Sequence, residues 1–171
     1  MASPAYMTVV GVTQGNISER AFTADSVGNT YQEGHEDEIY VLAVDSEVTI
    51  PTDPQSGQPR GQRSHKPFVV TKMFDKASPL LWQALCNGET LQISIDFYRT
   101  STKGGQELYF TIKLTDAIVV DMKGYFKNPQ LPENAHLGQL EDVSFVYRAI
   151  QWTHTVAGTS GQDDWRKPNM A

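Results

Sequence analysis

The most regular pattern in the sequence is a strict alternation of apolar and polar residues over 91–98 and again over 108–115. A period of two is typical of a β-strand that buries one face and leaves the other in water. The turn signal Lys103-Gly104-Gly105 between the segments predicts that they pair as an antiparallel hairpin. The hairpin would have one apolar and one polar face, and the polar positions of interest are Gln92, Ser94, Asp96, Thr111 and Lys113.

Helical spacing occurs in one segment, between Asp75 and Gly88, where apolar residues stand at positions 81, 84 and 85. Ser78 is expected to cap this helix, with Pro79 at its first position, where the missing N–H costs nothing. Gly88 stands where a helix ends in left-handed backbone. Because such a short helix needs a surface on which to bury its apolar side, we predict one helix packed against a β structure.

Some predicted strands have apolar residues on both faces. The segments with this pattern are 39–44, 117–120 and 143–152. We expect the first two to be covered on both sides, and the second face of 143–152 to be covered by the helix or by another subunit. Segments 6–12 and 68–74 are also predicted as strands, and 123–140 as irregular. Together they predict a mainly β protein: an antiparallel β barrel or sandwich, of two packed sheets, with one α-helix, in a single domain over 1–171.

The predicted loop 51–67 carries four prolines and two glycines and almost no apolar side chain. Loops of this length inside a domain are often functional, although some are only mobile. The loop is basic, with Arg60, Arg63 and Lys66 against Asp53, whereas the segment 18–47 holds eight acidic residues against one arginine. Opposite charges on two regions of one molecule suggest head-to-tail self-association, and the alternative is that both regions are merely solvated. The tail 157–171 is polar, with Trp165 as its one large anchor.

Composition narrows the class of protein. A length of 171 residues fits one domain, and a net charge of −6 argues against a general nucleic-acid binder. Cys86 is the only cysteine, so we expect it to pack on the helix in a protein that folds in a reducing compartment. Residues 1–6 lack the features of a signal peptide, and no apolar run reaches membrane-spanning length. We therefore expect folding in the cytoplasm, no membrane insertion, and any export by another route.

Catalytic motifs are absent from the sequence: it has no phosphate-binding glycine loop, no paired-cysteine metal site and no nucleophile elbow. The run Gly34-His35-Glu36-Asp37-Glu38 could form a metal or acid–base cluster, but we favour a solvated turn because neighbouring strand residues point to opposite faces. His65, beside two cations, could bind an anion, and we favour an ordinary surface loop. These residues predict no enzyme and no cofactor.

The same residues carry a resemblance that runs almost end to end. The sequence resembles the hemolysin-coregulated protein (Hcp) family, the tube protein of the bacterial type VI secretion system. The matching strings are Asp25-Ser26-Val27-Gly28, Gly34-His35-Glu36-Asp37-Glu38, Pro51-Thr52-Asp53-Pro54-Gln55-Ser56-Gly57, His65-Lys66-Pro67-Phe68, residues 75–85, residues 152–161 and Asp163-Asp164-Trp165. The match is weakest over 123–140.

The resemblance implies a β barrel with one helix that assembles into hexameric rings with an open centre. The rings would stack into an inner tube within a contractile sheath, tipped by a trimeric valine-glycine repeat spike protein, and would carry effector proteins in the lumen into target cells. The protein would be cytoplasmic before firing and then secreted without a signal peptide. Its role would be structural and transport-related rather than catalytic.

This resemblance turns the charge pattern into residue-level hypotheses. The interface between subunits or stacked rings would involve Asp53, Arg60, Arg63, His65, Lys66, Glu36, Asp37 and Glu38. The polar hairpin face would line the lumen, with ordinary outer surface as the alternative. Two other functions compete with this one: a phage-tail-like tube or baseplate component outside secretion, and a small β-barrel enzyme with its site at His35 and its acidic neighbours.

Overall fold

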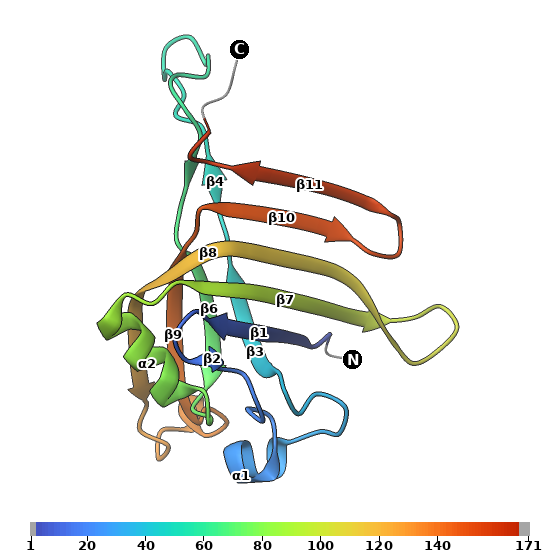
Figure 1. Ribbon diagram of the computed structural model, residues 1–171. Helices are drawn as coiled ribbons and strands as arrows, with labels where there is room; N and C mark the ends of the chain where they lie inside the picture. The colour runs from blue at the N-terminus through green and yellow to red at the C-terminus, as the bar shows by residue number, and fades with distance from the viewer. Residues whose placement is uncertain (1–2, 168–171) are drawn as a thin grey trace.

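The alternating segments form the centre of a large antiparallel sheet in the computed structural model, which describes residues 3–167 (Figure 1). The strands are β1 (Ala5–Gly11), β2 (Gly15–Asn16), β3 (Ile39–Asp45), β4 (Val48–Thr49), β5 (Ser64–His65), β6 (Phe68–Met73), β7 (Leu91–Thr100), β8 (Gln106–Phe126), β9 (Gln139–Val146), β10 (Ala149–His154) and β11 (Thr159–Asp164). The helices are α1 (Ala24–Val27) and α2 (Ser78–Asn87), with 3₁₀ turns over Gly28–Thr30 and Pro132–Asn134. The predicted fold class, mainly β and antiparallel, is confirmed.

The sheet closes into a barrel because the long strand β8 pairs twice. Its first part pairs with β7, and its second part pairs with β9, so that the strand order β8-β7-β1-β3-β6-β9 returns to β8. The inner face of the barrel is apolar, as the alternation predicts. Residues there that are at most 1% exposed include Met7, Val9, Phe68, Val70, Ile93, Ile95, Leu114, Val143 and Phe145.

Beyond the barrel, β10 and β11 continue the sheet past β8. The strands β11, β10, β8, β7 and β1 therefore form one broad wall, and they lie one above another in Figure 1. Sequence analysis placed 143–152 on one strand, but the chain breaks between β9 and β10 at Tyr147 and Arg148. The predicted polar tail also contributes a full strand, β11, whose register pairs Gln151 with Gln162. The last four tail residues lie outside the described residues.

Helix α2 packs beside β8 and buries Leu81 and Ala84 completely (Figure 1). Its C-terminal residue Gly88 has the predicted left-handed backbone, with φ 62°. The prediction for the start was wrong by one residue, since Ala77 occupies the cap position and Ser78 is the first helical residue. The Ser78 hydroxyl is held instead by groups outside the helix, as described below. The prediction that Cys86 is packed was also wrong, because its side chain faces solvent.

The predicted cover on both faces of strands 39–44 and 117–120 is not found within residues 3–167 of the single chain. The register shifts between Val41 and Ala43, and again between Val119 and Asp121. The residues at these bulges, Leu42 and Val120, are 44% and 46% exposed. Each lies next to a buried residue, Val41 or Val119, so alternation places it on the outer face of the barrel, where none of the other described residues covers it.

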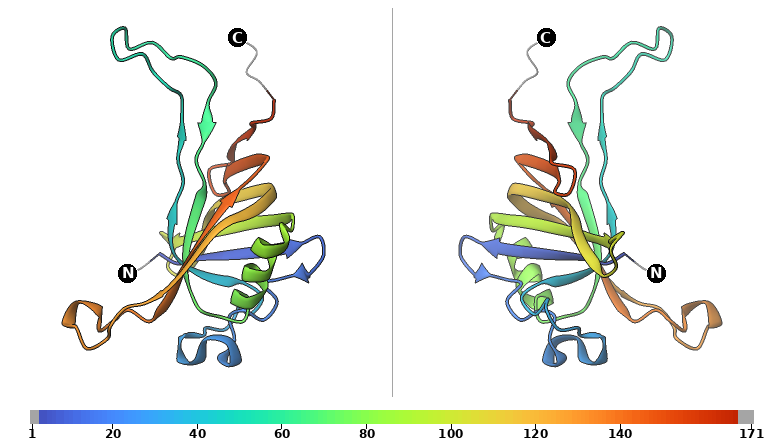
Figure 2. Two further views of the ribbon diagram at one scale, coloured as in Figure 1. Left: turned by 90° about the vertical axis from the view of Figure 1, so that its left-hand side faces the viewer. Right: turned by 90° about the vertical axis from the view of Figure 1, so that its right-hand side faces the viewer.

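The predicted loop 51–67 is an ordered projection. Strands β4 and β5 pair at its base, Thr52 and Pro59 form a further bridge, and the Asp53 carbonyl accepts a 2.8 Å bond from the amide of Gly57. In both views of Figure 2 this segment extends away from the barrel. We call residues 46–67 the arm. The irregular stretch 123–140 was also only partly predicted, since β8 continues to Phe126 and β9 begins at Gln139.

Candidate assembly surfaces

The five predicted lumen residues lie together on the polar face of the wall. Register places Ser94 opposite Lys113 and Asp96 opposite Thr111 on the neighbouring strand. The Thr111 hydroxyl donates a 3.0 Å hydrogen bond to Asp96, and Gln92, two residues before Ser94, donates a 2.8 Å bond to Asp116. The structure thus brings these side chains onto one surface, and their position in a lumen stays a prediction.

The polar face is wider than the sequence indicated. Lys113 is in register with Gln151 on β10, and Gln151 with Gln162 on β11. Across β7, Ser94 is in register with Thr8 on β1. One row across five strands therefore reads Thr8, Ser94, Lys113, Gln151 and Gln162, with one charge among hydroxyl and amide groups. Sequence reasoning missed β11 because its residues have no apolar alternation.

The acidic turn at 33–38 is ordered by hydrogen bonds and not only solvated. The side chain of Glu36 accepts a 3.0 Å bond from the Gly34 amide, which lowers the pKa of Glu36. Asp37 accepts a 3.1 Å bond from the Arg20 amide. The ring of His35 stacks on Tyr6 with centroids 3.8 Å apart. Within residues 3–167, no three His, Cys, Asp or Glu side chains are grouped so that they could hold a metal ion.

Glu38 differs from its acidic neighbours because it is partly buried. Its carboxylate lies 3.4 Å from His35 Nδ1, and its side chain is 23% exposed. Burial raises the pKa of Glu38, and His35 opposes part of that shift. These contacts hold the turn on the aromatic side chains around Tyr6. His35, which the sequence offered as a possible metal or acid–base residue, therefore has a structural role in this turn.

The charged residues of the arm divide into two groups. Arg60 lies on the exposed projection, and within residues 3–167 its side chain has no ion pair or hydrogen bond. Lys66 forms an exposed ion pair with Glu47 of the acidic segment, at 3.1 Å and within the same chain. Asp53 shapes the turn by accepting a 2.8 Å bond from the Gln55 amide.

Arg63 and His65 point back toward the barrel. Arg63 forms two hydrogen bonds to Asp163, at 2.7 and 2.9 Å. His65, expected on a surface loop, is only 8% exposed and lies between Asp163, at 2.6 Å, and the hydroxyl of Tyr147, at 2.8 Å. We call these four side chains the latch. Tyr147 and Asp163 were not predicted from the sequence to meet the arm.

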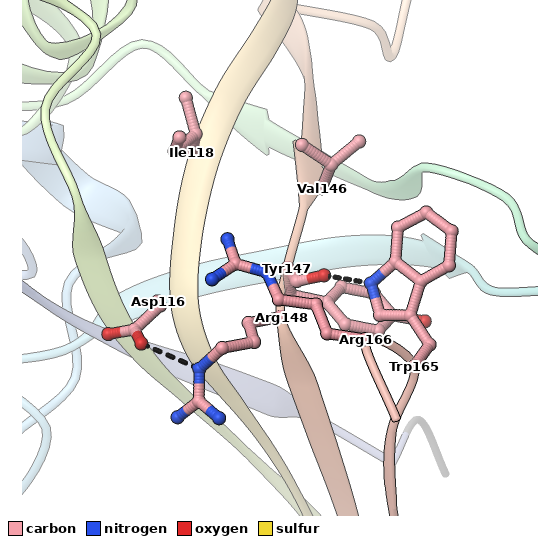
Figure 3. A pocket seen from close by; sticks show the side chains of 7 residues that line it. All are labelled: Asp116, Ile118, Val146, Tyr147, Arg148, Trp165 and Arg166. Atoms are coloured by element: carbon pink, nitrogen blue, oxygen red, sulfur yellow. Dashed lines mark hydrogen bonds and ion pairs between the residues drawn. The ribbon is translucent and has the colours of Figure 1, made fainter. Parts of the chain in front are cut away.

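A cavity of about 240 Å³ lies next to the latch, between β8, β9 and the residues after β11 (Figure 3). Its lining is Asp116, Ile118, Val146, Tyr147, Arg148, Trp165 and Arg166. Arg148 donates to Asp116 at 2.8 Å and to Asp164 at 2.6 Å, and its hydrogen bond lowers the pKa of Asp116. Trp165 donates its ring N–H to the carbonyl of Tyr147. Arg148 in this cavity is therefore already paired with two carboxylates.

A second group of charged side chains is buried between the barrel and α2. Lys72 contacts Glu141, Asp75 at 3.0 Å and the Ser78 hydroxyl at 3.0 Å. Glu141 also accepts hydrogen bonds from Ser78, at 2.6 Å, and from the ring of Trp82, at 3.1 Å. The Lys72, Asp75 and Glu141 side chains are at most 4% exposed. This group, the inner cluster, joins α2 to β6 and β9.

The charged ends of the molecule are far apart. The arm projects at one end, and α1 with the acidic turn lies at the opposite end in both Figure 1 and Figure 2. Large apolar side chains that remain exposed on the chain include Val10, Val12, Leu42, Val48, Ile50, Phe74, Val120 and Phe126. An apolar side chain that is exposed in the single chain becomes buried where it lies in a contact between subunits. No helix among the described residues is long and apolar enough to span a membrane.

Comparison with known proteins agrees with the fold. The chain is 62% identical over 169 residues to the "Major exported protein" of Pseudomonas aeruginosa, covering 98% of each chain. The structure described as "Crystal structure of Hcp protein" superposes with a TM-score of 0.93 at 48% identity, covering 97% of this chain and 99% of that one. The secreted protein Hcp3 from Pseudomonas aeruginosa gives a TM-score of 0.83 at 53% identity, covering 97% of this chain and all of that one.

The match to a family model covers most of the described structure. Residues 6–154 match the family described as "Type VI secretion system effector, Hcp". This range includes all of the barrel except the first residue of β1, and also the arm, α2 and the whole of β10. The chain therefore belongs to the Hcp family of type VI secretion system proteins.

Proposed function

We propose that this protein is a structural subunit of the inner tube of a type VI secretion system. Six copies would form a ring with an open centre, and rings would stack head to tail into a tube. The contractile sheath would drive the tube and its trimeric valine-glycine repeat spike into a target cell. The ring lumen would carry effector proteins, and the protein itself would have no enzymatic activity.

The placement of charge at the two ends of the molecule carries this proposal. The arm brings Arg60 to one end, and the acidic turn lies at the other (Figure 2). A copy stacked on a second copy in the same orientation would bring opposite charges together. Each exposed pair contributes only about 0–1 kcal/mol, but a ring would repeat the contact around its axis. Arg63 and Lys66, which we also assigned to this contact, are already paired within the chain.

The wall supports the proposal of a lumen. A lumen that transports varied cargo needs a wet surface with few strong binding groups, and the row from Thr8 to Gln162 has this chemistry. The exposed apolar side chains, such as Leu42 and Val120, support subunit contacts within a ring, since association would bury them.

The relatives support export. One is named as an exported protein and another as a secreted protein. We propose that this chain is also secreted by the type VI system, after folding in the cytoplasm, without a signal peptide. The alternative, a phage-tail-like component outside secretion, predicts the same rings but no protein in the culture medium.

The first test is the assembly state of the purified protein. Size-exclusion chromatography with light scattering should give six times the 19.0 kDa chain mass, and negative-stain images should show open rings. A monomer that is stable across protein and salt concentration would refute the ring.

The second test addresses stacking. Raised salt and Arg60→Glu should both reduce stacks to single rings, because screening and charge reversal act on the same contact. Lys103→Glu, the same charge change in the distant β7–β8 turn, is the matched control and should leave stacking unchanged. Stacks that persist through both treatments would contradict the charge mechanism while leaving the rings intact.

A further inference from the structure

The arm has few contacts of its own that could fix its direction. At its base, β4 and β5 form only two residue pairs, Val48 with His65 and Thr49 with Ser64. Further out, short-range bonds such as Arg60 N–H to the Pro51 carbonyl close the projection on itself. Residues 54–62 are exposed throughout. The arm is therefore held to the body of the molecule chiefly at its base.

The strongest side-chain contacts at that base are those of Arg63. Its guanidinium binds both oxygens of Asp163 and also donates to the carbonyls of Asp164, at 2.9 Å, and Lys167, at 2.7 Å. A forked guanidinium–carboxylate pair has a fixed geometry as well as charge-assisted bonds. The Arg63 side chain is only 9% exposed. It therefore does not face a neighbouring ring, which is the contact predicted for it from the sequence.

His65 also contacts the carboxylate of Asp163, and its other ring nitrogen faces the hydroxyl of Tyr147. The hydrogen bond from Arg63 lowers the pKa of Asp163, so Asp163 is ionised and accepts from His65 Nε2–H. Burial raises the pKa of Tyr147 to about 12, and its hydroxyl lies 2.8 Å from His65 Nδ1, within hydrogen-bond distance. Both arm residues of the latch therefore meet at Asp163, on the outermost strand of the wall.

We propose that Arg63 is a positioning residue that sets the direction of the arm by fixing its base to β11 through Asp163. The arm and the C-terminal strand then move as one unit, although they are 100 residues apart in sequence. A change at β11, such as a C-terminal fusion or a bound partner, would alter the arm through this contact. The consequence for stacking rests on the proposed function, whereas the coupling within the chain does not.

The test is hydrogen exchange measured by mass spectrometry on unstacked protein at high salt. Arg63→Ala should speed exchange about tenfold in both the arm peptides and the β11 peptides, since it removes charged hydrogen bonds at the joint. Asp163→Asn should also speed exchange in both regions, and the double variant should have less than the sum of the two single effects, because each single variant already removes the forked pair between the two residues. Arg60→Ala, which removes the same charge from an exposed position of the arm further from its base, should change neither region.

The variant Arg63→Lys is the control for a general loss of structure. It keeps the charge but not the fork, so it should give an intermediate exchange rate in both regions with unchanged exchange in α2 and β7. Unchanged arm exchange in Arg63→Ala, or additive effects of the two single variants, would overturn the proposal.

Negative-stain counts of stacks in low salt then separate this proposal from the proposed function. If Arg63 only positions the arm, Arg63→Lys should shorten stacks although its charge is kept. If Arg63→Lys stacks like the wild type and Arg63→Ala does not, Arg63 contacts the neighbour directly and the proposal fails. If the wild type forms no rings, the proposed function fails, and the hydrogen-exchange result still tests the role of Arg63 within the chain.

Discussion

The inner cluster and the latch are two groups of opposite charges that differ in their access to water. In the inner cluster, Lys72 and Glu141 are completely buried. In the latch, Asp163 is 26% exposed. Each group joins segments that are distant in sequence: 69 residues separate Lys72 from Glu141, and 100 separate Arg63 from Asp163.

The difference in hydration predicts different roles. A charge inside the barrel has no water to replace a lost partner, so the inner cluster must remain complete for the chain to fold. At the latch, water can reach Asp163, so the loss of Arg63 should change the arm without unfolding the barrel. Pairs of opposite charges thus stabilise the fold at the inner cluster, and at the latch they fix the direction of the arm.

The largest expected effect is at Lys72. Lys72→Met leaves the carboxylates of Glu141 and Asp75 buried without a cation, which should lower the free energy of unfolding by about 3–5 kcal/mol. Urea unfolding followed by circular dichroism measures this. Lys113→Met, the same substitution on the exposed face of β8, is the matched control and should stay within about 0.5 kcal/mol of the wild type.

A double variant sharpens the same prediction. Lys72→Met combined with Glu141→Leu removes the lysine and one of the two buried carboxylates, Asp75 being the other, and should recover part of the lost stability, because the cost comes from unpaired buried carboxylates rather than from the missing bond. Equal stability of Lys72→Met and wild type would mean that water enters the barrel at this point, and the contrast with the latch would be lost.

The two groups should respond to acid in opposite directions. Burial raises the pKa of Asp75 more than Lys72 lowers it, so ionised Asp75 costs stability at neutral pH, and this cost fades as the pH falls through its folded-state pKa. Arg63 lowers the pKa of Asp163, so Asp163 stabilises the fold above its unfolded pKa of about 4, and this contribution is lost as the pH falls through the folded-state value.

Urea titrations between about pH 7 and pH 3 on two variants check these signs. The stability of wild type relative to Asp163→Asn should fall as the pH decreases. Relative to Asp75→Asn, it should rise over the same range. Differences that move in the same direction would show that the two carboxylates do not differ as their surroundings imply.

The smallest expected effect is at Lys66. Lys66→Ala breaks a pair with Glu47 in which both side chains are more than half exposed, so the change in free energy of unfolding should stay below about 1 kcal/mol. The same urea assay measures it, with Lys76→Ala as an exposed lysine control. A loss as large as that of Lys72→Met would mean that exposure does not separate the groups.

The sequence predicted those elements that depend on local patterns. Alternation located β7 and β8, and the signals at Pro79 and Gly88 located α2, because turn, cap and periodicity rules act over a few residues. The polar face of the hairpin was also predicted correctly, since a strand fixes the side of every second residue.

The latch and the inner cluster could not be predicted with the same rules, because their partners are brought together only by the closed barrel. One signal was present for the inner cluster: Lys72 shares strand parity with Phe68 and Val70, and Glu141 with Val143 and Phe145. A lysine and a glutamate on buried faces suggest a buried pair. No comparable signal pointed from Arg63 to Asp163.

Strand β8 gives the molecule a particular mechanical character. Over its 21 residues the backbone bonds to β7 and β10 along one part and to β9 along the other. A force applied along the wall would load rows of these bonds in shear, so that many would have to break together. Since the same backbone continues into the barrel, the wall would transmit the force to the whole subunit instead of peeling away from it.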